Sequence, residues 1–234
     1  MASSCRRHVL LGNQRILGTY GENRPQQVYF VNNTGYDFLT LKTFVHKKPN
    51  SFLFIASGGQ VHKGLDLVLE AFARRPHLEL FVCSLFAEEG DFCSTYNRDS
   101  IKLQTSMPYT SMPWGTVDIG DRIFRQIADR CSFSILPSCS EANAGSVVMA
   151  MSAGVVPIVS RECGFDEGEV HYLRESTIDE IGIRADEHAQ KPLQWIVEEA
   201  GRVAVVAKAL YSTEQYSRSV RAALSALIEC RDRL

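Results

Sequence analysis

Residues 133–164 read FSILPSCSEANAGSVVMAMSAGVVPIVSRECG, and this stretch decides the fold. The short apolar runs FSIL and VVPIVS are typical of buried strands. Between them, small and apolar residues fill positions 145–153, and Gly154 follows where a helix would end. The order strand, loop, helix, strand predicts two parallel strands joined by a right-handed crossover.

The loop after the first of these strands, Ser138 to Gly145, is the expected ligand site. Parallel α/β sheets bind ligands at the carboxyl ends of their strands, and the start of a helix favours an anion such as a diphosphate. Glu141 in this loop would repel a phosphate but can accept hydrogen bonds from hydroxyls. A sugar joined to a diphosphate meets both conditions. The alternative is that Glu141 is a solvated loop residue or a helix cap.

The alternation of strands and helices continues through most of the chain. Strands are expected at 52–56, 77–83 and 101–106, an edge strand after Cys163, and helices at 63–74, 87–97, 118–129, 190–211 and 213–232. This pattern predicts an α/β fold, a Rossmann-like doubly wound parallel sheet flanked by helices. The dinucleotide fingerprint GxGxxG is missing, which argues against NAD binding.

The composition excludes several classes of function. With 45% hydrophobic and 22% charged residues the chain is typical of a soluble globular protein. A net charge of −2 gives no attractive field for nucleic acid, and no apolar run is long enough to be a transmembrane segment. Seven cysteines without a CxxC pair indicate reduced thiols, and together these features predict a cytoplasmic protein. Cys139 and Cys163, which flank the expected site, are either reactive thiols or core residues.

The motif around Glu141 resembles the signature of the group 1 GT-B glycosyltransferases. The matching residues are Pro137, Ser138, Glu141, Ala150, Met151, Ser152, Gly154, Pro157 and Ile158. The sequence departs from the pattern at Met149, where the family has a second Glu that usually contacts the ribose. An ordinary core methionine is the simpler interpretation of Met149.

A second segment, SGGQVHKGLDL at 57–67, resembles the G-R-x-x-x-x-K-G loop of the same family. Lys63 would neutralise the diphosphate as it leaves, without a metal, and no DxD metal motif is present. Gly58 or Gly59 stands where the family has an arginine, so half of that positive clamp is missing. His62 is a weaker candidate, and a solvated first-turn lysine is the alternative interpretation of Lys63.

The resemblance implies the C-terminal, donor-binding domain of a GT-B fold. Residues 46–234 would form the nucleotide-sugar-binding domain, and residues 1–45 a remnant of an N-terminal acceptor domain or an extension. The implied catalytic residues are Lys63 and Glu141. The implied donor-binding and diphosphate-binding residues are Gly58, Gly59, Lys63, Ser138, Ala144, Gly145 and Ser146, with no metal ligand.

The resemblance also implies a reaction. The chain would transfer a sugar from a nucleotide-diphosphate sugar, its donor substrate, to an acceptor, with no further cofactor. Because the family binds the acceptor on its N-terminal domain, we expect an acceptor-domain partner subunit. The alternatives are a non-catalytic nucleotide-sugar-binding or scaffold subunit, and a sugar-nucleotide epimerase. An epimerase would need further acid/base carboxylates and histidines around the site.

Overall fold

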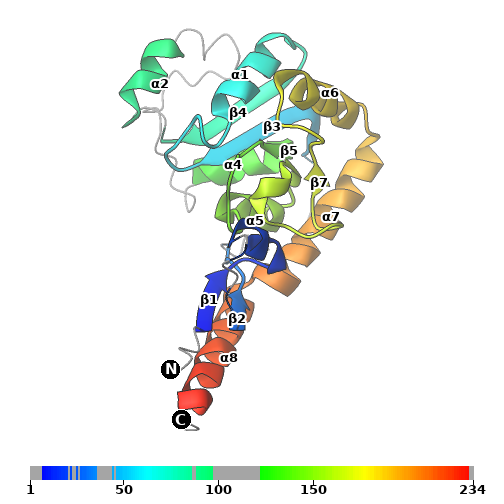
Figure 1. Ribbon diagram of the computed structural model, residues 1–234. Coiled ribbons are helices and arrows are strands. Elements are labelled where there is room, and N and C mark those ends of the chain that lie inside the picture. Colours follow the sequence, from blue (N-terminus) through cyan, green and yellow to red (C-terminus); the bar gives the residue numbers. More distant parts are fainter. Residues whose placement is uncertain are drawn as a thin grey trace.

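Five parallel strands form the main sheet in a computed structural model of the chain, in the order β4-β3-β5-β6-β7 (Figure 1). The structure describes residues 7–20, 22, 25, 27–35, 44, 46–85, 88–96 and 122–231. The strands are β3 (Lys48–Ala56), β4 (Glu79–Ser84), β5 (Cys131–Leu136), β6 (Val156–Val159) and β7 (His171–Tyr172). Each neighbouring pair is parallel, as the sequence predicts.

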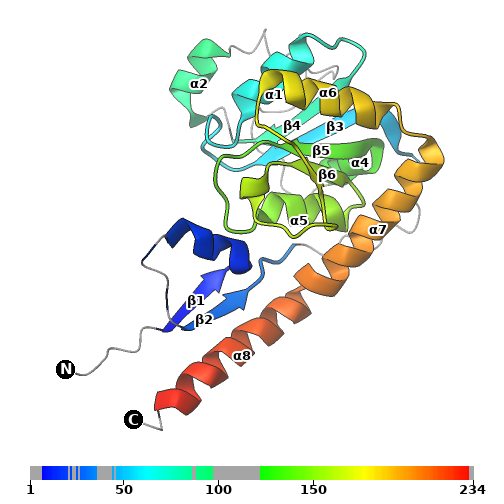
Figure 2. The ribbon, with the colours of Figure 1, turned by 45° about the vertical axis from the view of Figure 1, so that its right-hand side comes forward.

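Helices cover both faces of this sheet. Phe52 and Phe54 of β3 belong to one apolar cluster, and the alternate residues Leu53 and Ile55 belong to a second. The first cluster contains residues of α1 and α6, and the second contains Phe124 of α4. Figure 2 shows α1 and α6 above the strands and α5 below them. A strand that is buried on both faces explains why FLFIA is a continuous apolar run.

The described helices differ in their bounds from the sequence prediction by a few residues. They are α1 (Leu65–Ala73), α2 (Gly90–Thr95), α4 (Arg122–Arg130), α5 (Gly145–Ser152), α6 (Ile178–Ala189), α7 (Leu193–Tyr211) and α8 (Thr213–Arg231), with 3-10 turns η1 (Gln14–Tyr20) and η4 (Arg161–Cys163). The strand predicted at 101–106 lies outside the described residues. None of the helices in the described ranges is long and apolar enough to cross a bilayer.

One helix was not predicted. The sequence analysis assigned no element to residues 178–189, and α6 occupies this interval. Thr177 caps the helix, since its hydroxyl oxygen accepts a hydrogen bond from the Glu180 N–H at 3.3 Å. Thr177 and Glu180 have the spacing of a capping box, so the sequence carried the signal for a helix start.

Lys47 connects the carboxyl-terminal ends of two helices inside the domain. The residue is only 4% exposed, and its ammonium donates to the carbonyls of Ala128, Cys131 and Ala153 at 2.8, 2.9 and 3.3 Å. These carbonyls follow or end α4 and α5, where the helix dipoles are negative. Burial lowers the pKa of Lys47 to about 8.

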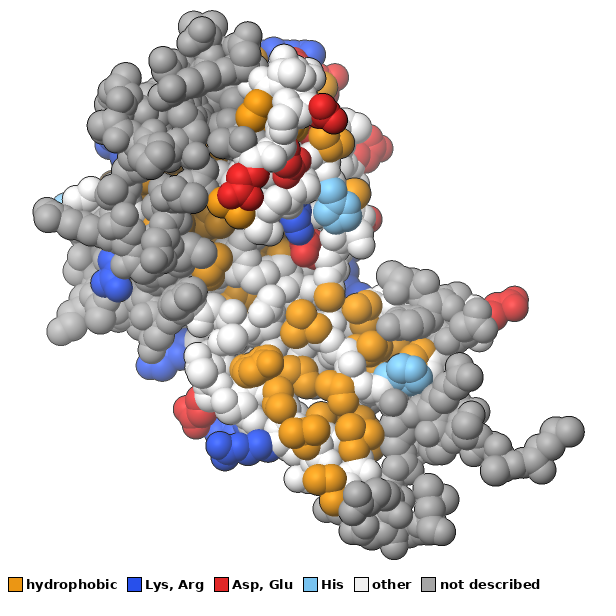
Figure 3. All heavy atoms as spheres, turned by 90° about the vertical axis from the view of Figure 1, so that its left-hand side faces the viewer, with side chains coloured by type: hydrophobic (Ala, Val, Ile, Leu, Met, Phe, Trp, Pro, Cys, Tyr) orange, Lys and Arg blue, Asp and Glu red, His pale blue; other side chains and the backbone are white. Residues whose placement is uncertain are grey.

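The N-terminal segment forms a separate two-stranded parallel sheet. Strands β1 (Arg7–Leu11) and β2 (Gln27–Val31) pair along their length, and α8 packs against β2 (Figure 2). Apolar side chains of α8 are only partly covered, since Leu224 is 51% and Ile228 57% exposed. Figure 3 shows hydrophobic side chains gathered over this lower part of the molecule.

Candidate functional site

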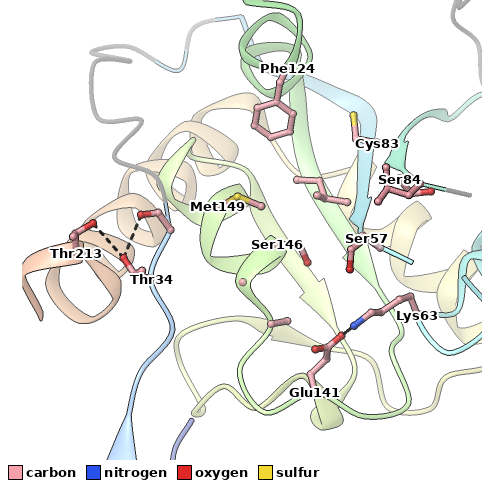
Figure 4. Close-up of a pocket in the computed structure, with 16 residues that line it drawn as sticks. Thr34, Ser57, Lys63, Cys83, Ser84, Phe124, Glu141, Ser146, Met149 and Thr213 are labelled. Carbon is pink, nitrogen blue, oxygen red and sulfur yellow. Dashed lines mark hydrogen bonds and ion pairs between the residues drawn. The ribbon is translucent and has the colours of Figure 1, made fainter. Parts of the chain in front are cut away.

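A cavity of about 740 Å³ lies at the carboxyl ends of β3, β4 and β5. Its walls come from the loops that follow these strands, from the start of α5, and from Thr34 and Thr213 near the N-terminal sheet and α8. Figure 4 shows these side chains arranged around the opening. This is the edge at which parallel sheets bind ligands, as the sequence analysis expected.

Lys63 and Glu141 meet on one wall of the cavity. Lys63 Nζ donates to Glu141 Oε1, and the two side chains are 17% and 18% exposed (Figure 4). Ser138, which is fully buried, directs its hydroxyl to the same carboxylate oxygen at 3.4 Å. Removal from water lowers the pKa of Lys63. The charge of this lysine is therefore matched by one carboxylate in the cavity wall.

Parallel topology explains why these residues meet. Lys63 precedes α1 and follows β3, and Glu141 follows β5, the direct neighbour of β3 in the sheet. The two loops are also joined by their backbones, since Cys139 N donates to the carbonyl of His62 at 3.0 Å. Gly64 has φ of +74°, and an added Cβ would lie 2.7 Å from Cγ of Pro137. A glycine at this position lets the two loops touch.

The start of α5 also lines the cavity, through Ala144, Gly145 and Ser146. First-turn N–H groups of a helix have no partner within the helix, so this end favours an anion. The Ala144 N–H is already used, because it donates to the carbonyl of Cys163 at 3.2 Å. Gly145 also packs closely, since an added Cβ would lie 2.9 Å from Nδ2 of Asn33.

The glycine loop is held by an internal carboxylate. Gly58 and Gly59 are not among the residues that line the cavity. Glu89 instead accepts hydrogen bonds from the N–H of Gly59 and from the N–H of Gln60, the latter at 3.0 Å. Gly59 has φ of +80°, which turns consecutive N–H groups toward one point. The arginine position of the resembled motif thus lies beside Glu89, a residue that no sequence pattern singled out.

Part of the lining is apolar. Met149 lines the cavity together with Ile55, Cys83, Leu85 and Phe124. Thr34 and Thr213 also line it, and their hydroxyls lie 3.5 Å apart (Figure 4). Sequence reasoning missed both threonines, because each lies far along the chain from the motifs and belongs to no pattern.

No metal centre accompanies these residues. In the described part of the chain, no group of three or more His, Cys, Asp or Glu side chains gathers to hold a metal ion. Positive charge in the cavity therefore comes from Lys63 and from the start of α5, among the residues that the structure describes.

Known proteins resemble this chain in structure and not in sequence. No family model matches the sequence, and no curated protein matches it either. HepE from Anabaena, solved with UDP and glucose, superimposes with a TM-score of 0.68 at 14% identity over 93% of this chain. Sucrose-phosphate synthase from Thermosynechococcus elongatus gives 0.69 at 12% identity over 95%, and the GtfA/B complex gives 0.65 at 17% over 97%. The fold is that of the GT-B glycosyltransferases.

The chain spans only part of these GT-B proteins. It covers 63% of HepE, 59% of sucrose-phosphate synthase and 46% of the matched chain in the GtfA/B complex. Its five-stranded parallel sheet with flanking helices is the Rossmann-like C-terminal domain of the GT-B fold, as predicted from the motif around Glu141. The division of the chain at residues 45 and 46 stays a prediction.

Proposed function

We propose that this chain is the donor-binding half of a glycosyltransferase. The observation that carries the proposal is the Lys63–Glu141 pair in the wall of a large cavity at the carboxyl ends of the strands. A lysine matches a diphosphate, and a carboxylate matches sugar hydroxyls. The GT-B fold of the chain supports this assignment over an unrelated nucleotide-binding role.

In the proposed complex, the diphosphate lies between Lys63 and the start of α5, and the sugar lies beside Glu141. Breaking the bond between sugar and phosphate increases the negative charge on the diphosphate. A fixed ammonium and a helix terminus stabilise that charge without having to reorganise, which lowers the barrier. The Ser138 hydroxyl lies 3.4 Å from the Glu141 carboxylate and 3.3 Å from the carbonyl of His62, so its single proton is shared between these two acceptors. No cofactor beyond the nucleotide-sugar donor is part of the proposal.

The acceptor would be bound by a second domain, in the same chain or in a partner subunit. Apolar side chains of α8 are exposed, as are Val9 and Leu11 of β1. This exposure supports the proposal that the second domain packs against α8 and β1. A two-stranded parallel sheet is not expected to be stable alone, because parallel sheets are normally covered on both faces. The chain covers less than two thirds of each of these GT-B neighbours, which agrees with a second domain outside the region matched.

We also propose that the protein is cytoplasmic. Among the described cysteines, Cys131, Cys139 and Cys163 form no disulfide, which supports a reducing compartment.

The test is a panel of UDP, GDP and ADP and their glucose conjugates, with the melting temperature of the chain as the readout. A ligand at 100 times its Kd adds about 2.7 kcal/mol to the free energy of unfolding, which is easily measured. A uniform lack of shift across the panel would overturn the proposal. Binding without release of nucleotide diphosphate, alone or with an acceptor domain, would favour the non-catalytic alternative.

A further inference from the structure

We propose that Cys139 and His62 form a reactive thiol–imidazole pair that takes up small disulfides, a modification site separate from the donor cavity. Cys139 lies on the loop after β5 and is exposed. Its Sγ lies 3.1 Å from Nδ1 of His62, on the loop after β3. The pair does not line the donor cavity.

The hydrogen bonds of the imidazole fix the direction of proton transfer. His62 Nε2 lies 2.8 Å from the carbonyl oxygen of Ser140, which can only accept. In the neutral ring the proton is therefore on Nε2, and Nδ1 presents its lone pair to the thiol. A nucleophile, a base within hydrogen-bond reach and a third group that orients the base are the parts of an activated nucleophile.

The backbone holds the pair in this geometry. The Cys139 N–H donates to the carbonyl of His62 at 3.0 Å, and the Ser138 hydroxyl lies 3.3 Å from the same carbonyl. These bonds fix the two loops relative to each other. The backbone bonds therefore set the separation of the two residues, and the contact of Nε2 with the Ser140 carbonyl holds the orientation of the imidazole.

The other described cysteines are unlike Cys139. Cys83, Cys131 and Cys163 are buried, and burial raises the pKa of Cys163 to about 11. Cys93 is partly buried. Cys163, which the sequence analysis treated together with Cys139, is fully buried and lies within hydrogen-bond distance of the carbonyl of Leu136 at 3.4 Å. Exposure therefore separates the two cysteines that flank the site.

A second cavity beside Cys139 indicates the class of reagent. It has a volume of about 330 Å³ and is lined by Cys139 and by the charged residues Arg161, Glu162, Arg174 and Glu175. Two guanidinium groups and two carboxylates suit a small peptide that carries both carboxylates and an amine. Glutathione disulfide belongs to this class, because each of its halves is a small peptide with carboxylates and an amine.

The reaction is a thiol–disulfide exchange. The Cys139 sulfur attacks one sulfur of the disulfide while His62 Nδ1 takes the thiol proton. A new bond forms between Cys139 and that sulfur, the original disulfide bond breaks, and the departing thiolate recovers the proton from His62. One thiol and one disulfide give one mixed disulfide and one free thiol, so no further oxidant is needed.

The experiment measures the rate of adduct formation at each cysteine of the full chain with glutathione disulfide, by peptide-resolved mass spectrometry. Cys139 should react faster than Cys93, and His62→Gln should slow Cys139 by about tenfold or more at pH 7. The exposed His77→Gln is the matched control and should leave the rate unchanged. Equal rates at Cys139 in the wild type and in His62→Gln would overturn the proposal.

Two further measurements separate a base from a merely structural histidine. At about pH 9.5, where an ordinary thiol ionises without help, the rates of wild type and His62→Gln should converge. A deficit that persists at this pH would show that His62 only positions the thiol and would overturn its role as the base. Arg174→Gln should slow glutathione disulfide severalfold and leave the cationic disulfide cystamine no slower. Equal slowing of both reagents would exclude the second cavity as the binding site.

Discussion

Lys63 and Glu141 form an ion pair although 78 residues separate them in the sequence. The pair bridges the loops after β3 and β5 and is largely removed from water. Among the described residues that line the cavity, Lys63 is the one lysine, and the carboxylate pairs with it. An incoming diphosphate must therefore compete with Glu141 for the ammonium, so the two residues should have opposite effects on the binding of a bare diphosphate.

Lys63→Ala should remove most of the affinity for a nucleotide diphosphate. A hydrogen bond to a charged group contributes about 1.5–3 kcal/mol, so Kd should rise by about tenfold to a hundredfold. Isothermal titration with UDP, or with whichever nucleotide the panel selects, measures the change. Lys208→Ala, in the exposed part of α7, is the control and should bind like the wild type. An unchanged Kd in Lys63→Ala would remove Lys63 from the site.

Glu141→Gln should separate the sugar from the phosphate. The amide no longer neutralises Lys63, so the bare diphosphate should bind at least as tightly as it does to the wild type. The nucleotide sugar should lose affinity relative to the diphosphate, because a carboxylate is the stronger acceptor for hydroxyls. Titration of both ligands gives the ratio of the two affinities. Equal changes for the two ligands would make Glu141 a structural loop residue.

Met149→Leu is the matched control for that experiment. Met149 lines the same cavity but has no strong hydrogen-bonding group for a ribose. The substitution conserves volume and should change the free energy of unfolding by less than about 1.5 kcal/mol. Nucleotide affinity should change little. A large loss of affinity would show that the thioether contacts the donor directly.

The parallel sheet and the placement of Lys63 and Glu141 at one edge of it could be predicted from the sequence, whereas the strand order and the ion pair between the two residues were not. Apolar runs of strand length alternate with helical periodicity from residue 51 onward, and parallel strands bring their following loops to one edge. Lys63 lies in the loop after the run that forms β3, and Glu141 lies in the loop after the run that forms β5. Their proximity therefore follows from topology alone.

Other parts of the site depend on contacts that no local pattern encodes. Thr34 and Thr213 approach each other across 179 residues. Glu89 accepts hydrogen bonds from the N–H groups of Gly59 and Gln60. In the sequence it is one acidic residue in a polar stretch, and nothing there indicates this contact. Helix α6, in contrast, does have a local signal in the sequence, the capping box of Thr177 and Glu180. The many charged residues that follow make its apolar face hard to recognise from the sequence.

Gly64→Ala should destabilise the domain. The residue has a left-handed backbone, and the new Cβ would lie 2.7 Å from Cγ and 2.9 Å from the carbonyl oxygen of Pro137. A left-handed non-glycine residue costs about 1–3 kcal/mol, and the clash adds to this. Urea denaturation measures the loss. Gly201→Ala, inside α7 with nothing within 4 Å, should instead gain about 0.5–1 kcal/mol.

Nucleotide binding should not require a divalent metal. Lys63 and the start of α5 supply the positive charge in the proposed site. Titrations with and without EDTA should give the same Kd. A signal that is lost with EDTA and restored with Mg²⁺ or Mn²⁺ would mean that a metal joins the diphosphate.

Lys47 should make the stability of the domain rise with pH above about pH 8. Burial lowers the pKa of this lysine to about 8 from 10.5, so between these values the unfolded chain holds a proton that the folded chain lacks. The free energy of unfolding then increases with pH across this window, by up to about 3 kcal/mol.

Lys47→Met keeps the side-chain volume, removes the titration and leaves three carbonyls without their donor. The variant should be less stable, and its deficit relative to the wild type should widen from pH 8 to pH 10 in urea denaturation. Cys131, whose pKa burial raises, is present in both proteins, so to first order its contribution cancels in the difference. The exposed neighbour Lys48→Met should show a deficit that does not change with pH. A constant deficit in Lys47→Met would mean that the ammonium stays charged in the fold, stabilised by its carbonyl partners at the ends of α4 and α5.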